Sequence, residues 1–361
     1  MHTALPPPLL HAGAVAVAVS GGVDSLYSLV LLKERGVEVL ALHAFFRPPD
    51  AAARATAAQL EQFCAARSVH YATLDLHREF ETLVIAPFSA EYLDGRTPNP
   101  CARCNAAMKF GLLFDQARLR GATRLATGHY ARILEHAAWG PVLARGVDPV
   151  KDQSYFLSLA PIERLACTVF PLAGLHKKET LTALERRGIV PPLPVESQEI
   201  CFIPNDDYRA FLTDRWRERG VRQPGPGEIR LPDGSCIGRH RGLWNYTPGQ
   251  RRGLGLSWSE PLYVLDKDAA QNILVVAPAA AARSQGCVAG EINFHVPFAA
   301  WPASIRVQTR YRQQARPARA AYDGARLTIR FDALAGPQAA GQILSVYTDD
   351  GVVLGGGVIE S

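Results

Sequence analysis

Short apolar runs alternate with amphipathic segments along the first third of the chain. Four apolar runs predict buried strands, at residues 13–19, 37–45, 69–76 and 124–127. The intervening segments predict helices, at residues 26–35, 51–67, 80–93 and 106–120, with Pro87 able to break the third. Strands that alternate with helices are typical of a parallel sheet with helices on both faces, so we expect an α/β fold here.

The pattern changes in the second half of the chain. Composition shifts at 191–194 and again at 223–227, where Pro and Gly cluster. Beyond the second shift the helical spacing is lost, and short strand-like runs follow at 262–265, 273–276, 305–311, 327–331, 343–347 and 352–354. Turn residues separate these runs, which predicts a small antiparallel barrel. We therefore expect a parallel-sheet domain over 1–205, a central linker domain over 206–260 and a C-terminal β-barrel over 261–361.

The sequence SGGVDS, residues 20–25, joins the first predicted strand to the first predicted helix. Paired glycines let backbone N–H groups approach an anion, and a helix N-terminus favours negative charge. The common P-loop is excluded, because it requires a lysine that this stretch lacks. An ionised Asp24 can only accept hydrogen bonds, so we expect it to hold the loop or a Mg²⁺ ion rather than a phosphate. The pattern resembles the PP-loop of ATP pyrophosphatases; the alternative is an ordinary serine-capped turn.

Ligands of parallel sheets bind beyond the carboxyl ends of the strands. The glycine loop, Ala44 and the pair Gly128–His129 each lie at or just after the end of a predicted strand. We expect all three to meet at one edge of the sheet, which predicts a nucleotide site there.

Seven scattered cysteines argue against a secreted disulfide scaffold. Cys101 and Cys104 lie in TPNPCARCN, in a stretch (94–105) that is expected to be irregular. If Asn105 caps the next helix, Cys104 lies at a helix N-terminus beside Arg103, and both features lower the pKa of a thiol. Such a pair has three interpretations, a redox pair, metal ligands or chance. Zinc would need further ligands. Cys201, in SQEICFI, is a further candidate, although a single cysteine is more often a buried core residue.

The chain of 361 residues is 48% hydrophobic and carries a net charge of +5, which is compatible with nucleic-acid binding without requiring it. Five arginines and no acidic residue occur within 301–320, and four more surround Trp244 and Tyr246. Arginine beside aromatic rings suits phosphates and unstacked bases, and the alternative is a solvated basic surface. Neither a secretory signal nor a membrane-spanning stretch is apparent, so we expect a cytoplasmic protein that does not bind membranes.

Eight sequence blocks occur in one order: SGGVDS, TPNPCARCN, TGHYAR, KDQSYFL, SQEICFI, TPGQRRGLG, TRYR and LGGGVIE. This set resembles the bacterial tRNA-specific 2-thiouridylase family of the PP-loop ATP pyrophosphatase superfamily, over nearly the whole chain. The resemblance implies an adenine nucleotide alpha-hydrolase-like domain followed by the two smaller domains. It also implies ATP-dependent thiolation of C2 of the wobble uridine in tRNA anticodons, through adenylation of the C2 oxygen.

The resemblance also implies roles for individual residues. The implied catalytic residues are Cys104, as nucleophile, and Cys201, as persulfide carrier, which a disulfide between them would resolve. The implied ATP-binding residues are Ala18, Val19, Ser20, Gly21, Gly22, Val23, Asp24, Ser25, Ala44 and Gly128. The implied tRNA-binding residues are Asn99, Pro100, Cys101, Lys151, Asp152, Gln153, Arg310 and Tyr311. ATP and Mg²⁺ are the implied cofactors. The implied partners are tRNA and a sulfur-relay or cysteine desulfurase protein as persulfide donor.

Some positions depart from the family pattern. Ala44 stands where many members have Met, Pro48 and Pro49 replace a longer acidic stretch, and Val195 and Glu196 replace Lys and Asp. At position 101 some members have Asp and others Cys.

Two kinds of alternative remain open. With three cysteines, Cys101, Cys104 and Cys201 could hold an iron–sulfur cluster whose open iron delivers sulfide. Different function classes are a small-molecule PP-loop synthetase and an inactive tRNA-binding relative.

Overall fold

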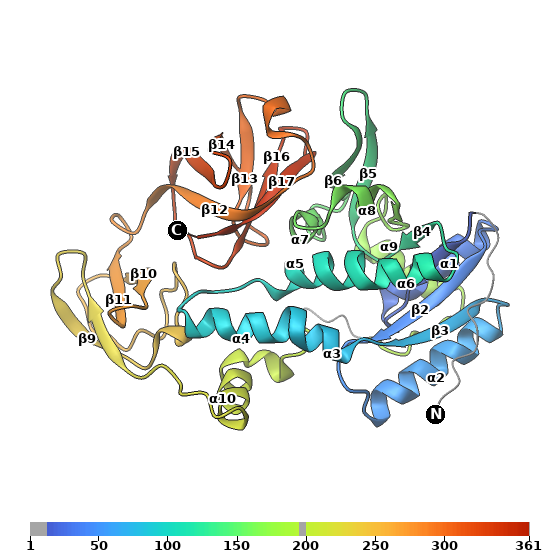
Figure 1. Ribbon diagram of the computed structural model, residues 1–361, viewed down its shortest axis with the longest axis horizontal. Helices are drawn as coiled ribbons and strands as arrows, with labels where there is room; N and C mark the ends of the chain where they lie inside the picture. The colour runs from blue at the N-terminus through green and yellow to red at the C-terminus, as the bar shows by residue number, and fades with distance from the viewer. Residues whose placement is uncertain (1–12, 195–199, 361) are drawn as a thin grey trace. The chain divides into compact units, whose positions relative to one another are not determined.

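The chain folds into two compact units (Figure 1). The computed structural model describes residues 13–194 and 200–360. Of the described residues, the first unit comprises 13–84, 102–194 and 351–353, and the second comprises 85–101, 200–350 and 354–360. The Pro-rich start of the chain lies outside the described residues. So do Val195, Glu196 and the first three residues of the SQEICFI block.

The first unit contains a five-stranded parallel sheet in the order β3-β2-β1-β4-β7 (Figure 1). Its strands are β1 Val15–Ala18, β2 Val39–Phe45, β3 His70–Asp75, β4 Arg124–Ala126 and β7 Thr168–Val169. The first four are the strands predicted from the apolar runs, and the parallel α/β fold is confirmed. β1 lies between β2 and β4, so the strand order reverses direction at β1, where doubly wound sheets bind ligands.

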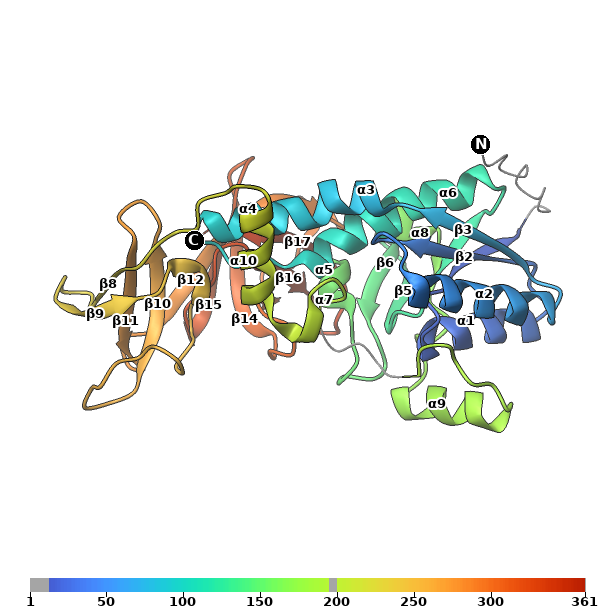
Figure 2. The same cartoon turned by 90° about the horizontal axis from the view of Figure 1, so that it is seen from below.

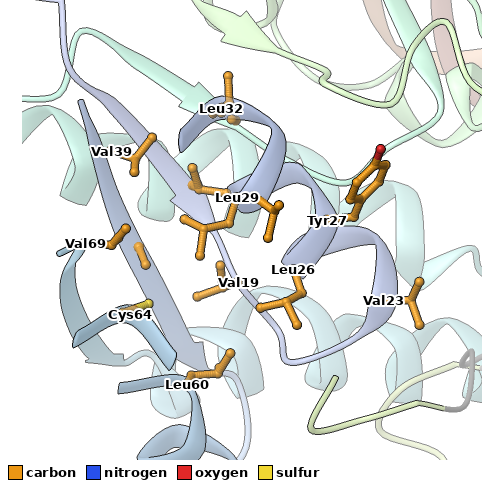
Figure 3. Packing of buried hydrophobic residues seen from close by; sticks show 14 of the residues in the cluster. Val19, Val23, Leu26, Tyr27, Leu29, Leu32, Val39, Leu60, Cys64 and Val69 are labelled. Carbon is orange, nitrogen blue, oxygen red and sulfur yellow. The ribbon is translucent and has the colours of Figure 1, made fainter. Parts of the chain in front are cut away.

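Helices of the first unit pack on this sheet and on one another. They are α1 Val23–Glu34, α2 Ala51–Ala65, α3 His77–Phe80, α6 Phe114–Leu119, α7 Ser154–Leu157, α8 Ile162–Ala166 and α9 Lys177–Arg186. Figure 3 shows Leu26 and Leu29 of α1 packed with Val19, Val39 and Leu60. Helix α1 contacts the sheet on one side and α9 on another (Figure 2). These two contacts explain why eight of the twelve residues of α1 are buried. A hairpin, β5 Ala131–His136 and β6 Gly140–Arg145, follows β4 and was not apparent in the sequence.

The region around Cys101 and Cys104 differs from the expectation. Helix α5 runs over Pro100–Cys104 and continues into the π-helix η2, Asn105–Leu113. The prediction of irregular structure up to residue 105, with Asn105 as a helix cap, was therefore wrong. Proline suits the first turn of a helix, because its φ is already helical and the N–H it lacks would have no partner there. Asn105 is instead buried within the helix and donates to the Phe156 carbonyl at 3.1 Å.

Pro87 does not break the helix that was predicted over residues 80–93. It lies at the start of α4, Ala86–Leu93, directly after the π-helix η1, Glu81–Ile85. The first turn of a helix tolerates proline for the reason given above.

The second unit contains α4 and, further along the chain, α10 Tyr208–Glu218. The Trp216 indole N–H of α10 donates to the Ser89 hydroxyl of α4 at 2.8 Å. A four-stranded sheet follows in the order β10-β11-β8-β9. Its strands are β8 Gly227–Arg230, β9 Cys236–His240, β10 Leu262–Asp268 and β11 Ile273–Pro278. We expected residues from 261 onward to form the C-terminal barrel, whereas β10 and β11 pair with the central strands.

The rest of the second unit is a closed six-stranded barrel in the order β12-β15-β14-β13-β16-β17. The strands are β12 Ser284–Phe294, β13 Ile305–Gln308, β14 Arg316–Tyr322, β15 Leu327–Ala335, β16 Ile343–Tyr347 and β17 Val353–Ile359. Short 3-10 turns also occur in this unit, η3 Pro204–Asp206, η4 Leu243–Asn245 and η5 Phe298–Ala300. The predicted antiparallel barrel is confirmed, although the sequence did not reveal β12 or β14.

Candidate functional site

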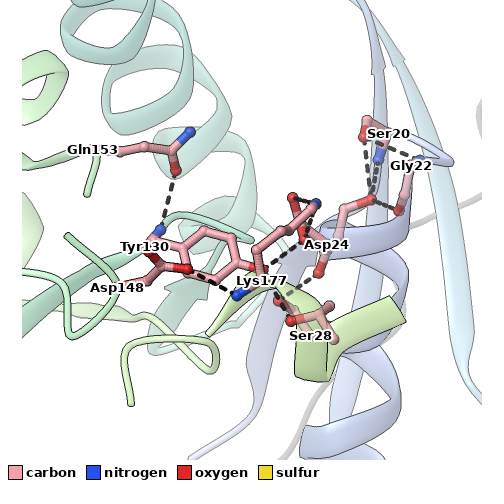
Figure 4. A network of polar contacts seen from close by, with 10 residues as sticks. Ser20, Gly22, Asp24, Ser28, Tyr130, Asp148, Gln153 and Lys177 are labelled. Atoms are coloured by element: carbon pink, nitrogen blue, oxygen red, sulfur yellow. Dashed lines mark hydrogen bonds and ion pairs between the residues drawn. The ribbon is translucent and has the colours of Figure 1, made fainter. Parts of the chain in front are cut away.

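The two serines of the SGGVDS loop bind each other and the loop backbone (Figure 4). The Ser25 hydroxyl donates to the Gly22 carbonyl at 3.0 Å and accepts from the Ser20 backbone N–H at 3.1 Å. Gly21 has a φ of +90°, in the left-handed region where a side chain would be strained. These contacts fix a tight turn between β1 and α1.

The start of α1 has the features of an anion site. Its capping residue is Gly22, which has no side chain that could accept from the first turn. By contrast, α2 is capped by the Asp50 carboxylate and α10 by that of Asp207. The first backbone N–H groups of a helix have no partner within the helix, so those of α1 are oriented to bind a phosphate.

The loop after β4 approaches the start of α1 very closely. A Cβ on Gly128 would lie 2.9 Å from the Asp24 carbonyl carbon and 3.0 Å from the Ser25 nitrogen. Only glycine fits this contact. Ala44 lies at the end of the neighbouring β2, half-buried, and the adjacent His43 ring donates to the Val19 carbonyl at 2.8 Å. The predicted convergence of the loop, Ala44 and Gly128 at one sheet edge is therefore confirmed as an arrangement, whereas ATP binding by these residues stays a prediction.

A lysine that sequence reasoning missed contacts this loop. Lys177, the first residue of α9, places its ammonium 2.6 Å from both carboxylate oxygens of Asp24 (Figure 4). The Tyr130 hydroxyl donates to the same carboxylate at 2.9 Å and contacts the Thr180 hydroxyl. The Lys177 backbone N–H donates to Asp148 at 3.0 Å, which fixes the start of α9. The Asp24 carboxylate is thus fixed by Lys177 and Tyr130, and Lys177 supplies a cation next to a loop that has no lysine of its own.

His129, next to Gly128, is a neutral buried base. Its Nδ1 lies 2.8 Å from the Thr127 hydroxyl, and its Nε2 accepts from the Lys109 ammonium at 3.5 Å. Burial, and to a smaller extent the positive charge of Lys109, lower the pKa of His129 well below its ordinary value of 6.5.

His129→Gln is expected to make the first unit less sensitive to acid. As the pH falls below 6.5, the unfolded chain binds a proton at this histidine that the folded chain does not, so the free energy of unfolding falls by about 1.4 kcal/mol per pH unit. Glutamine does not titrate, so the variant should lose about 1 kcal/mol less between pH 7.5 and 5.5. Urea unfolding of both proteins at the two pH values measures this difference. Equal acid losses would contradict the buried neutral state of His129.

The segment 151–153 is built around a buried carboxylate. Asp152 accepts from the Arg145 guanidinium at 2.7 Å and from the Gly146 and Ser154 backbone N–H groups. The Gln153 side chain accepts from the Tyr130 N–H at 3.0 Å. Asp152 therefore fixes this turn from the interior, and its neighbours Lys151 and Gln153, which also belong to the predicted tRNA-binding set, are half-buried.

The candidate cysteines differ in exposure. Cys104 is buried and ends α5, so the prediction that it lies at a helix N-terminus was wrong. Cys101 is half-buried, next to Pro100 at the start of the same helix, and Cys201 is exposed. Phe202 anchors the turn that carries Cys201, because its buried ring packs against that of Phe88, with 5.3 Å between the two ring centres. An exposed thiol on an anchored turn suits a residue that receives sulfur from another molecule.

Arg310, a predicted tRNA contact, is held by two parts of the second unit. Its guanidinium donates to the carbonyls of Pro248 and Pro337, both at 2.7 Å. It thereby joins the TPGQRRGLG block to the barrel. Tyr311 is half-buried, with the Arg312 guanidinium 5.4 Å from its ring centre.

The described part of the chain shows neither a metal-ligand cluster nor a membrane-spanning helix. Within residues 13–194 and 200–360, no group of three or more His, Cys, Asp or Glu side chains is arranged to hold a metal ion. In the same ranges no helix combines the length and apolarity needed to cross a membrane.

Three known protein families match successive parts of the chain. Residues 13–205 match the family description "tRNA methyl transferase HUP domain", residues 217–278 a "tRNA methyl transferase PRC-barrel domain" and residues 284–359 an "Aminomethyltransferase beta-barrel domain". The chain is thus of the class of multidomain proteins that join a HUP domain to two β domains.

Curated relatives narrow the class to one family. The chain is 55% identical over 345 residues to a tRNA-specific 2-thiouridylase MnmA of Nitratidesulfovibrio vulgaris, covering 96% of this chain and 98% of the relative. Relatives of the same name from Oleidesulfovibrio alaskensis and Lawsonia intracellularis are 51% and 46% identical, covering 96% of this chain and 99% and 98% of their own. The chain belongs to the tRNA-specific 2-thiouridylase family.

Proposed function

We propose that this protein uses ATP to replace the C2 oxygen of the wobble uridine in tRNA with sulfur. The observation that carries the proposal is the 55% identity to a curated 2-thiouridylase over almost the full length of both chains. The intact SGGVDS loop and all three cysteines, at 101, 104 and 201, support an active enzyme rather than an inactive relative.

ATP fits the edge of the first unit's sheet. The uncapped start of α1 and the glycine turn before it offer backbone N–H groups to phosphates, and Lys177 offers a cation. Residues 18–25 with the backbone at Ala44 and Gly128 would enclose the nucleotide. Mg²⁺ would be held by the triphosphate, where it would neutralise charge that develops on the phosphates.

The first chemical step activates a poor electrophile. The uridine C2 oxygen attacks the α-phosphorus of ATP, the bond to the β-phosphate breaks and pyrophosphate leaves. The C2–O bond then has AMP as its leaving group. Fixed N–H donors aimed at the phosphates stabilise the charge that builds up in the transition state.

The second step transfers sulfur. The terminal sulfur of a persulfide on Cys201 attacks C2, and AMP leaves with the bonding electrons of the C2–O bond. The Cys104 thiolate then attacks the Cys201 sulfur; the persulfide bond breaks, its electrons stay on the sulfur bound to C2, and a disulfide between the two cysteines forms. A thiol reductant must reopen this disulfide. A sulfur-relay or desulfurase protein must then restore the persulfide.

The second unit offers a basic surface suited to RNA. Arg319 of β14 and Arg330 of β15 are direct cross-strand neighbours, both exposed, at a groove of about 730 Å³ that the single carboxylate of Asp332 also lines. Like charges directly opposite each other destabilise a sheet unless an anion lies over them. Phosphates of a bound tRNA would supply that anion, at a salt-sensitive affinity.

The iron–sulfur alternative uses the same reaction with a different sulfur carrier. Thiolates of Cys101, Cys104 and Cys201 are the ligands that an iron–sulfur cluster would require. This alternative and the persulfide route give different spectra, because only the cluster would colour the anaerobic protein brown.

One assay tests the proposed function against its competitors. Purified protein, ATP, a persulfide donor and unmodified tRNA are expected to release AMP only when tRNA is present, and mass analysis of the digested tRNA should find oxygen exchanged for sulfur in the wobble uridine. AMP release without tRNA would favour a small-molecule synthetase. No release under any condition would favour an inactive tRNA-binding relative.

The location follows from this chemistry. The reaction consumes ATP and needs reduced cysteines, both of which the cytoplasm supplies. We therefore infer a cytoplasmic enzyme.

A further inference from the structure

The segment between α4 and α5, residues 94–99, leads directly into Cys101 and is held within the second unit. The Thr97 N–H donates to the Ala340 carbonyl at 2.7 Å. The Gln342 amide donates to the Thr97 carbonyl at 2.8 Å and to the Pro98 carbonyl at 3.2 Å. These hydrogen bonds fix the backbone of Thr97, which is buried, to the residues that lead into β16 of the barrel.

A lysine of the central sheet holds the same segment from another side. The ammonium of Lys267, on β10, donates to the Thr97 hydroxyl at 3.0 Å, to the Arg96 carbonyl at 3.3 Å and to the Tyr246 carbonyl at 2.9 Å. These three oxygens use all three N–H donors of the ammonium. Two of them belong to the segment before Cys101, so a single side chain fixes its place relative to the central sheet.

Lys267 is an unusual choice for a purely structural contact. It forms no salt bridge with any described residue; the neighbouring Asp266 is exposed and accepts from the Lys267 backbone N–H at 2.8 Å. Burial lowers the pKa of Lys267 to about 7, because removing the ammonium from water costs free energy and disfavours the charged form. A methionine of similar length would fill the space without that cost, but it could not donate to these three oxygens.

We propose that Lys267 is a positioning residue that sets the place of residues 99–101 by holding Arg96 and Thr97. The base-facing role of residues 99–101 rests on the proposed function. The contacts of Lys267 with Arg96 and Thr97, called the hold below, do not rest on the proposed function, because they lie within the second unit. Lys267 acts through the segment and is not a catalytic residue.

Alkylation of Cys101 reports the hold directly. Lys267→Met in the full chain is expected to speed iodoacetamide labelling of Cys101 by about tenfold, because the hydrogen bonds that Lys267 donates to the segment are lost. Thr97→Val, which removes one of the three contacts and keeps the lysine, should give a smaller increase in the same direction. Peptide mass spectrometry reads each cysteine separately. Labelling of Cys101 at the wild-type rate in both variants would overturn the proposal.

Three internal controls separate positioning from unfolding. Cys64 and Cys287 are buried and must stay unlabelled in every variant, while exposed Cys236 must label at one rate throughout. Lys33→Met is the matched control variant, because the exposed Lys33 ammonium also donates to a carbonyl, that of Ser68, at 3.2 Å in the first unit. It should leave Cys101 unchanged. If Lys267→Met exposes Cys287, Thr97→Val alone decides the outcome.

Sulfur transfer gives the second readout. Lys267→Met is expected to lower the maximal rate of tRNA thiolation by about tenfold while the affinity for ATP stays unchanged. Faster labelling of Cys101 together with wild-type thiolation would overturn the positioning role. A wild-type protein that never thiolates tRNA would refute the proposed function instead, and the labelling would still test the hold.

Discussion

Replacing Cys201 with serine is expected to stop sulfur transfer to tRNA while ATP cleavage continues. The serine hydroxyl cannot carry a persulfide, so tRNA thiolation should fall by about a thousandfold or more, as for loss of any covalent carrier. Adenylation precedes sulfur transfer, so pyrophosphate should still appear, up to about one equivalent per tRNA. The measurement is a pyrophosphate time course beside mass analysis of the same tRNA.

The matched control for this prediction is Cys236→Ser. Cys236 is also exposed and also belongs to the second unit, but it lies on β9 of the central sheet. It should thiolate tRNA like the wild type. Full activity of Cys201→Ser, or equal losses in both variants, would refute the persulfide role.

The same series distinguishes the two sulfur carriers. With a persulfide, Cys101→Ser should keep sulfur transfer and the anaerobic protein should be colourless. With a cluster, Cys101→Ser should abolish transfer, and the wild type should show broad absorbance that this variant lacks. A colourless anaerobic protein that thiolates tRNA excludes the cluster.

The sequence predicts what is encoded in contiguous residues. The strand, glycine turn and helix around residues 15–34 form as predicted, because each is set by local spacing and by glycine. The helix at Pro100 was missed because proline and asparagine were interpreted as turn residues. The same proline also suits a first helical turn.

Features that depend on tertiary pairing were not predictable. β10 and β11 have the same apolar alternation as the barrel strands, and nothing in their sequence says that β11 pairs with β8 in parallel. Asp152 and Arg310 were expected to face tRNA. Asp152 accepts a hydrogen bond from Arg145, and Arg310 donates to the carbonyls of Pro248 and Pro337. Only the tertiary structure shows these contacts. Lys177 is the clearest case, because it lies 153 residues from Asp24 in the sequence.

Lys177→Met is expected to lower ATP cleavage by about a hundredfold or more. The variant removes the cation beside the phosphate-binding turn and leaves the Asp24 carboxylate, which is three-quarters buried, without its ion pair. Loss of one well-placed charge that stabilises a transition state has effects of about 10²–10³ on rate. Pyrophosphate release with saturating ATP and tRNA measures the loss. The control is Lys178→Met, which changes the adjacent, exposed lysine and should cleave ATP normally.

A double variant decides why Lys177 matters. If the ammonium only neutralises Asp24, then Asp24→Asn combined with Lys177→Met removes both charges and should recover most of the lost rate, because asparagine keeps an oxygen for the Tyr130 hydroxyl. If the ammonium moves to the phosphates when ATP binds, the double variant should remain as slow as Lys177→Met alone. We expect the second result, since the SGGVDS turn has backbone donors but no other lysine or arginine of its own. Wild-type pyrophosphate release by Lys177→Met would exclude both roles.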